Sequence, residues 1–188
     1  MKRLMKRLMS ETIICVFLVI VVAVCSIRSK DGDARRADDA VGALQKLALA
    51  VHNYYDFNNV FPSAYDEDGR TWKESGVLKP YLDDLAGCSG YAMLVDDEGV
   101  FPTTPGQKTK NFGEITDGAK VTIMFVERAD PNDDRACITA DEFYEQLRNC
   151  PIDKKGYSVA LASGGVGILR KDASRYALMA FTTKAGGV

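Results

Sequence analysis

Histidine and tryptophan are nearly absent from this chain, and each occurs once in 188 residues. His52 is the only imidazole, so no Ser-His-Asp or Cys-His arrangement can be read from the sequence. A P-loop and a G-x-G-x-x-G motif are also missing, and the paired glycines at 164–165 and 186–187 are expected in a turn and a terminus. We therefore predict a protein that is not an enzyme, with His52 at a surface or an interface.

An excess of positive charge is missing as well. The formal net charge is −2, and residues 31–188 contain 18 basic and 25 acidic side chains. A domain near −7 would repel a phosphate backbone, which excludes nucleic acid as the expected partner.

Only one long hydrophobic run is present, Ile13–Ile27, and it follows a basic stretch that ends at Arg7. As a helix these 15 residues span roughly 23 Å, somewhat less than a hydrocarbon core of about 30 Å. Flanking residues could extend the span, since arginine side chains can reach the membrane surface. We predict a basic flank and single transmembrane helix over residues 1–30, in the inner (cytoplasmic) membrane. The N-terminus is expected inside and the C-terminal domain in the periplasm or outside the cell.

Other interpretations of the N-terminal region stay open at this point. The run is also compatible with a processed pilin-type leader, or with a signal peptide or lipoprotein leader cut before Cys25. A buried core helix is the remaining alternative, which the basic start and terminal position disfavour.

A long amphipathic helix is predicted over residues 33–58, and we call it the spine helix. Its apolar residues recur every three or four positions, which places Leu44, Leu47, Val51 and Tyr55 on one buried face. Aspartates before and within the first turns suit the start of the helix, and Asn58, Asn59 and Pro62 are expected to end it.

The remainder, up to residue 188, is typical of an α+β domain. The pattern predicts strands at 90–95, 100–101 and 121–126, and a hairpin of 157–162 with 166–170 turning at Gly164. A capping box at Thr139 and Glu142 predicts a helix to about Asn149. A short C-terminal helix is expected from Asp172, as N-cap, to Lys184.

Two further patterns concern metal and sulfur. Asp130, Asn132 and Asp134 have the one-three-five spacing that begins a calcium loop, but Arg135 stands where such a loop has glycine. A solvated acidic loop is the competing interpretation. Among the five cysteines, we predict a disulfide between Cys137 and Cys150, which flank the helix expected after Thr139.

Four blocks in order resemble one family. They are ALQKLALAVHNYYDFNNVFPSAY (43–65), TWKESGVLKPYLDD (71–84), ITDGAKVTIMFVE (115–127) and FTTKAGGV (181–188). Together they resemble bacterial pilin-like proteins of the prepilin-type cleavage/methylation, H-x9-DG class, whose members are largely uncharacterised. The positions that match the family pattern are His52, Pro62, Trp72, Pro80, Tyr81, Thr116, Asp117, Gly118, Glu127, Gly164 and Gly186.

The resemblance implies a hydrophobic helix that continues into an amphipathic one, packed on an antiparallel sheet. It also implies export, membrane anchoring and assembly into a pseudopilus with itself or with other pilin-like subunits. The chain departs from the pattern in two places. No glycine precedes Glu11, where the leader is usually cut, and Asp153 and Ser163 stand where the family has the histidine and the aspartate of its name.

The leading hypothesis is therefore a non-enzymatic, membrane-anchored, pilin-like structural or secretion-associated protein of the cell envelope. The alternative is an exported binding module on the same scaffold. Its loops around Trp72, Asp96–Gly99 and Asp130–Asp134 would bind calcium, a glycan or a protein partner.

Overall fold

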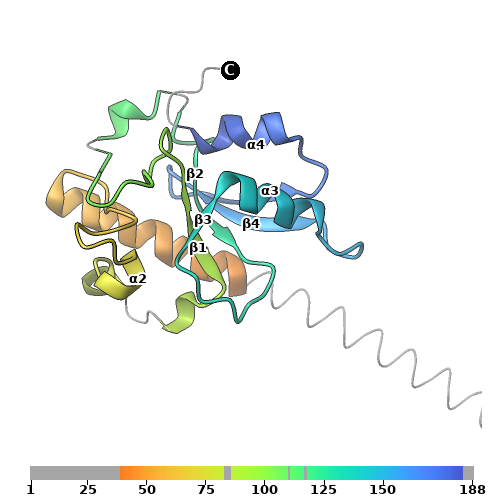
Figure 1. Ribbon diagram of the computed structural model, residues 1–188, viewed down its shortest axis with the longest axis horizontal. Coiled ribbons are helices and arrows are strands. Elements are labelled where there is room, and N and C mark those ends of the chain that lie inside the picture. Colours follow the sequence, from red (N-terminus) through yellow and green to blue (C-terminus); the bar gives the residue numbers. More distant parts are fainter. Residues whose placement is uncertain (1–38, 83–85, 110, 117, 184–188) are drawn as a thin grey trace, which may run out of the picture. The chain divides into compact units, whose positions relative to one another are not determined.

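The computed structural model describes residues 39–82, 86–109, 111–116 and 118–183, and these form an α+β domain with a five-stranded sheet (Figure 1). The chain divides into the units Met1–Asp39 and Ala40–Val188, and the description below concerns the second. The apolar run Ile13–Ile27 and the expected helix start near Asp33 lie outside the described residues. Within the described residues, no helix is both long enough and apolar enough to span a membrane.

The spine helix is present over residues 39–58, which confirms the prediction for that part of it. Leu44, Leu47 and Val51 are fully buried on its inner face, as their spacing indicates, and Tyr55 is half-buried beside them. The helix ends where predicted, because Asn59 adopts the left-handed conformation with φ 53° and donates its N–H to the Tyr55 carbonyl.

Five strands form one sheet in the order β3-β1-β2-β4-β5. Their bounds are β1 Tyr91–Val95, β2 Ile123–Glu127, β3 Cys137–Thr139, β4 Gly156–Leu161 and β5 Val166–Arg170. The β4–β5 hairpin is confirmed. The strand expected at 100–101 is reduced to a single bridge between Val95 and Phe101.

The prediction of an antiparallel sheet is wrong at one edge, since β3 pairs with β1 in parallel. After β2, the chain passes the start of β1, where the N–H of Arg128 bonds to the Gly90 carbonyl and the Gly90 N–H bonds to the Asp133 carbonyl. It then enters β3 on the far side of β1, while β4 occupies the other side of β2. β3 therefore runs antiparallel to β2. Because β1 is also antiparallel to β2, β3 and β1 are parallel.

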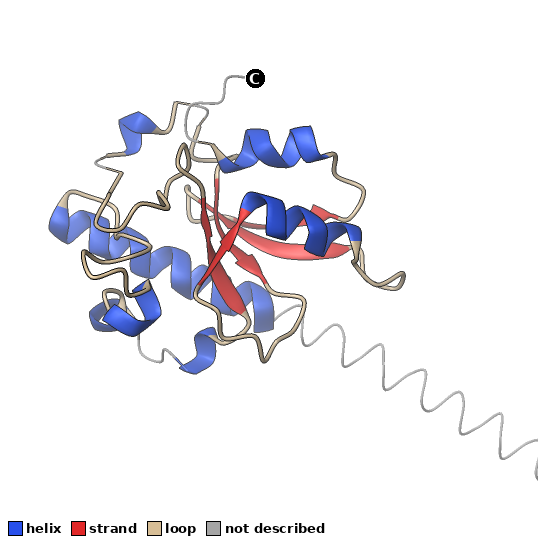
Figure 2. Ribbon diagram, viewed as in Figure 1, coloured by secondary structure: helices blue, strands red, loops and turns tan. Residues whose placement is uncertain are grey.

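Helices cover both faces of the sheet (Figure 2). The spine helix lies on one face, and α3 (Ala140–Arg148) and α4 (Arg175–Thr182) contribute to a second hydrophobic cluster on the other. The capping box of Thr139 and Glu142 is confirmed. The expected N-cap of α4 is wrong, because Ser174 accepts the N–H of Ala177 while Asp172 pairs with Arg170.

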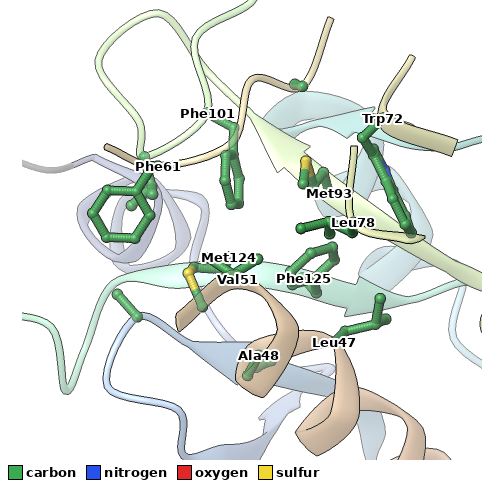
Figure 3. Close-up of a cluster of buried hydrophobic side chains, with 14 of the residues drawn as sticks. Leu47, Ala48, Val51, Phe61, Trp72, Leu78, Met93, Phe101, Met124 and Phe125 are labelled. Atoms are coloured by element: carbon green, nitrogen blue, oxygen red, sulfur yellow. The ribbon is translucent and has the colours of Figure 1, made fainter. Parts of the chain in front are cut away.

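The larger hydrophobic cluster lies between the spine helix and the sheet (Figure 3). Trp72 enters it from the short helix α2 (Trp72–Ser75), and the ring of Phe125 on β2 meets the Trp72 ring edge-on. Removing apolar side chains of this size from water stabilises the fold by roughly 2 kcal/mol each. The same burial removes these side chains from any role in binding a partner.

Candidate functional site

The most connected polar site lies where α2 meets the loop that joins β2 to β3, residues 128–136. Thr71 caps α2 through a capping box with Glu74, which fixes the direction of the residues that follow. Trp72 donates its indole N–H to the Ala136 carbonyl at 2.7 Å, and Lys73 donates to the Asp134 carbonyl at 3.1 Å. The two neighbouring side chains of α2 thus hold two points of the loop.

Trp72 is fully buried, so it offers no exposed ring for a sugar or a peptide. The Lys73 ammonium lies 5.5 Å from the centre of the Trp72 ring, and burial lowers its pKa from the ordinary value. The site chosen from sequence around Trp72 is therefore a packing contact between α2 and the loop.

Two residues of the calcium pattern accept hydrogen bonds from within the domain. Asp130 accepts the backbone N–H of Asn132 at 2.9 Å, and the Asp134 carbonyl is bonded to the Lys73 ammonium. Among the described residues, no group of three or more His, Cys, Asp or Glu side chains is arranged to hold a metal ion. The geometry is that of an Asx turn, which Asp and Asn favour in loops.

Asp133, which the calcium pattern skips, is the central acid of this loop. Its carboxylate lies 2.5 Å from Nη2 of the buried Arg128 and 2.9 Å from Nη2 of Arg135. The hydrogen bonds from Arg135, and then those from Arg128, hold the pKa of Asp133 well below its ordinary value. No local spacing identifies this acid, because Arg128 is buried only once the loop has folded over the start of β1.

The two acidic loops of the binding-module hypothesis lie at opposite ends of β1. Gly90, before the strand, bonds to Asp133, whereas the Asp96–Gly99 turn follows Val95. Five strand residues separate the two loops by roughly 16 Å. The Asp96 turn is closed on itself, with its side chain accepting the Glu98 N–H at 2.9 Å and its carbonyl accepting the Gly99 N–H. These loops do not form one surface.

Two of the family-motif positions, His52 and Gly164, meet at another corner of the domain. The His52 ring stacks on Phe112, with centroids 5.4 Å apart and planes 17° apart, and its Nε2 faces Gly164. The Gly118 carbonyl accepts the N–H groups of Val121 and Thr122 next to the same hairpin turn. His52 Nε2 is buried and has no hydrogen-bond partner among the described residues. His52 is thus a packed residue rather than an exposed one.

Glu127 lies at the end of β2 and connects this strand to β4. Its Oε2 accepts the backbone N–H of Ser158 on β4 at 2.9 Å, and its Oε1 lies 2.8 Å from Lys154 Nζ. The ammonium of Lys154 also lies 4.0 Å from the centre of the Tyr157 ring. Burial raises the pKa of Tyr157 to about 12, so this phenol stays neutral.

The remaining motif positions stabilise loops. Pro80 is the second residue of the 3-10 helix Lys79–Tyr81, and Tyr81 meets Tyr54 of the spine helix edge-on. Pro62 is buried in the segment that follows the spine helix, and Thr116 lies in the loop before Gly118. Asp117 and Gly186 lie outside the described residues.

The predicted Cys137–Cys150 disulfide is absent, and both residues are free thiols. The nine residues of α3 separate them, which sets them roughly 13 Å apart along the helix and beyond the reach of a disulfide. Cys137 Sγ lies 3.9 Å from the Ala64 carbonyl oxygen and Cys150 Sγ lies 3.7 Å from that of Lys154. Burial raises the pKa of Cys137 to about 11, so this thiol is a packing group and not a nucleophile.

The outer face of the spine helix is the feature that sequence periodicity did not single out. Leu49 is 59% exposed and Phe57 is 80% exposed. They lie eight residues apart, about two turns, on the side away from Leu44 and Leu47. Leu49 and Phe57 are the large apolar side chains that this helix exposes among its described residues.

No family model, curated protein or solved structure matches this chain.

Proposed function

We propose that this protein is a non-enzymatic, membrane-anchored, pilin-like structural subunit of the cell envelope. The single observation that carries the proposal is the two-sided spine helix. Its inner face is buried on the sheet, and its outer face presents Leu49 and Phe57 to solvent. A helix that only closed a domain would need no apolar residues on that second side.

The position of this helix in the chain supports the same function. The apolar run Ile13–Ile27 precedes the spine helix, and a short stretch with basic and acidic residues separates the two in the sequence. In the proposal, the run anchors the protein in the membrane and the acidic domain is exported. The outer face of the spine helix, with Phe57 as its largest apolar side chain, contacts a neighbouring subunit or another pilin-like protein.

The first experiment is the intact mass and N-terminal residue of the protein purified from membranes of its native host. An unprocessed Met1 form supports a stand-alone anchored protein. A chain that starts near Glu11 with a methylated terminus supports entry into a pseudopilus. A start at Cys25 or Ser26 contradicts the anchor.

A second experiment tests the outer face itself. The exchange Phe57→Glu is expected to leave thermal unfolding unchanged, because the side chain is 80% exposed, and to abolish cross-linking to neighbouring subunits in native membranes. Ile152→Glu, at an apolar position that is 97% exposed and lies outside this helix, is the matched control for one added negative charge. Equal cross-linking in both variants would contradict a contact through Phe57.

A calcium titration separates this proposal from the binding-module alternative. The Asp130 side chain is engaged by Asn132, and Lys73 donates to the Asp134 carbonyl, so we expect calcium and a chelator to leave the melting temperature unchanged. A calcium-dependent rise in melting temperature would favour the alternative, since a ligand that binds only the folded state stabilises it.

A further inference from the structure

We infer that the open edge of β5 pairs with β5 of a second copy of this chain, which joins two sheets across a two-fold axis. β5 is the last strand in the order β3-β1-β2-β4-β5, and no described strand pairs with its outer side. This inference goes beyond the proposed function and does not rest on it.

The backbone of β5 offers a regular set of unpaired groups. Leu161 donates to the Gly165 carbonyl and Lys171 donates to the Lys155 carbonyl, so residues 165 and 171 bond toward β4. Residues on an antiparallel strand alternate between the two sides. Val166, Ile168 and Arg170 therefore direct their N–H and C=O groups to the open side.

Two of the devices that usually protect a sheet edge, a proline and a bulge, are missing from β5, whose one charged residue is Arg170 at its end. β5 contains no proline, and its pairing with β4 runs without a bulge from Val166 to Arg170. Its central side chain, Ile168, is 57% exposed and apolar. The opposite edge strand, β3, has only three residues and leads directly into α3, which leaves little room for a partner.

The residue pattern favours a second copy as the occupant. An antiparallel pairing centred on Ile168 places Ile168 opposite Ile168 of the other copy and Arg170 opposite Val166. All five strand residues are then used, with about six backbone hydrogen bonds. A shift of the centre to Arg170 would instead place two arginines opposite each other, which is unfavourable.

The second face of the paired strands is also complementary. In this register Leu169 of one copy lies opposite Gly167 of the other. A methyl group added at Gly167 would meet nothing within 4 Å, so there is open space above this glycine. The leucine side chain of the second copy fits that space. Lys171 lies opposite Gly165, so this register brings no like charges together.

The test uses the full chain in detergent micelles, with the protein mass measured by light scattering over a dilution series. The wild type is expected to dimerise. Ile168→Lys and Ile168→Glu each place two like charges at the two-fold axis, so each is expected to weaken the dimer at least about tenfold. An equimolar mixture of the two variants is expected to restore a dimer, because lysine then faces glutamate.

Three results would overturn the inference: a wild type that stays monomeric, a dimer that persists in Ile168→Lys, or a mixture that stays monomeric. Thermal unfolding of each variant shows that the fold is intact.

Oxidation of Ile168→Cys is expected to yield a covalent dimer, since opposed Cα atoms lie about 5.5 Å apart, within disulfide range. Wild type and Tyr176→Cys, which is exposed on α4, are the controls. If mass analysis shows that the N-terminal segment is cleaved, the proposed function changes. The expected dimer and the expected effects of the Ile168 variants stay the same.

Discussion

Asp133 and Arg128 form a close ion pair, with the carboxylate Oδ2 2.5 Å from the guanidinium Nη2, at the point where the chain leaves β2 and turns toward β3. The Arg128 side chain is only 4% exposed, and its Nη1 has no hydrogen-bond partner. Within the described residues, Asp133 is therefore the counter-ion of the buried Arg128 guanidinium.

The exchange Asp133→Asn is expected to lower the free energy of unfolding at pH 7 by about 3 kcal/mol, because it leaves the Arg128 charge buried and unpaired. Urea denaturation measures the change. Asp134→Asn, an exposed neighbour in the same loop, is the control and is expected to stay within about 0.5 kcal/mol of wild type.

The same carboxylate predicts a pH dependence. Its folded pKa is lower than its unfolded value, so its contribution is complete above the unfolded pKa of about 4 and is lost as pH falls toward the folded pKa. The free energy of unfolding of wild type is thus expected to decline below pH 4. Asp133→Asn should show a shallower decline, and parallel curves would contradict the assignment.

Trp72→Phe keeps an aromatic ring against Phe125 but removes the indole N–H that bonds the Ala136 carbonyl. The buried carbonyl then lacks its partner, and we expect a loss of about 1–2 kcal/mol in the free energy of unfolding. Trp72→Ala should cost about 3–5 kcal/mol because it also leaves a cavity. Chemical denaturation of the two variants separates the hydrogen bond from the packing.

His52→Phe is expected to stabilise the fold by about 1 kcal/mol, because it replaces a buried nitrogen that has no partner with an apolar ring that stacks on Phe112. The melting temperature should rise. The exposed neighbour Asn53 provides the control, and Asn53→Gln should leave the melting temperature unchanged. A destabilised His52→Phe would indicate that the ring nitrogen contributes a favourable contact.

Gly42 lies within the spine helix, and a methyl group at this position would meet nothing within 4 Å. Gly42→Ala is therefore expected to raise the free energy of unfolding by about 0.5–1 kcal/mol through helix propensity alone. The reverse exchange next to it, Ala43→Gly, should lower it by a similar amount. No change in either variant would mean that this part of the helix does not unfold with the domain.

Gly156 on β4 lies close against the backbone of β5 and leaves no room for a side chain. A methyl group there would lie 2.9 Å from Cα of Arg170 and closer still to the Leu169 carbonyl. Gly156→Ala is expected to separate the strands and to lower the free energy of unfolding by about 3 kcal/mol or more. Gly167→Ala on β5, where the added group meets open space, is the matched control for stability of the monomer.

Several elements could be predicted because their signals are local. The buried stripe of Leu44, Leu47 and Val51 follows from three- and four-residue spacing, and the start of α3 follows from Thr139 and Glu142. The N-cap of α4 was misplaced because two residue types with capping side chains, Asp172 and Ser174, lie close together. In the structure Ser174 accepts the N–H of Ala177, whereas Asp172 pairs with Arg170.

The candidate site was less predictable than the helices. The spacing of Asp130, Asn132 and Asp134 indicated a metal loop, whereas the acid that organises the loop is Asp133. Its role depends on Arg128, which becomes buried only when the loop crosses the start of β1. Cys137 and Cys150 were paired because they flank one helix, although the length of that helix keeps them apart.

By itself, the sequence determined where the spine helix, α3, the central strands and the β4–β5 hairpin lie, because caps, periodicity and turn glycines act between residues a few positions apart. Only the tertiary structure decided that β3 lies parallel to β1, that His52 meets Gly164 and that β5 has an open edge. These features depend on contacts between distant segments, and the free energy of such contacts comes from burial and pairing that no single segment contains.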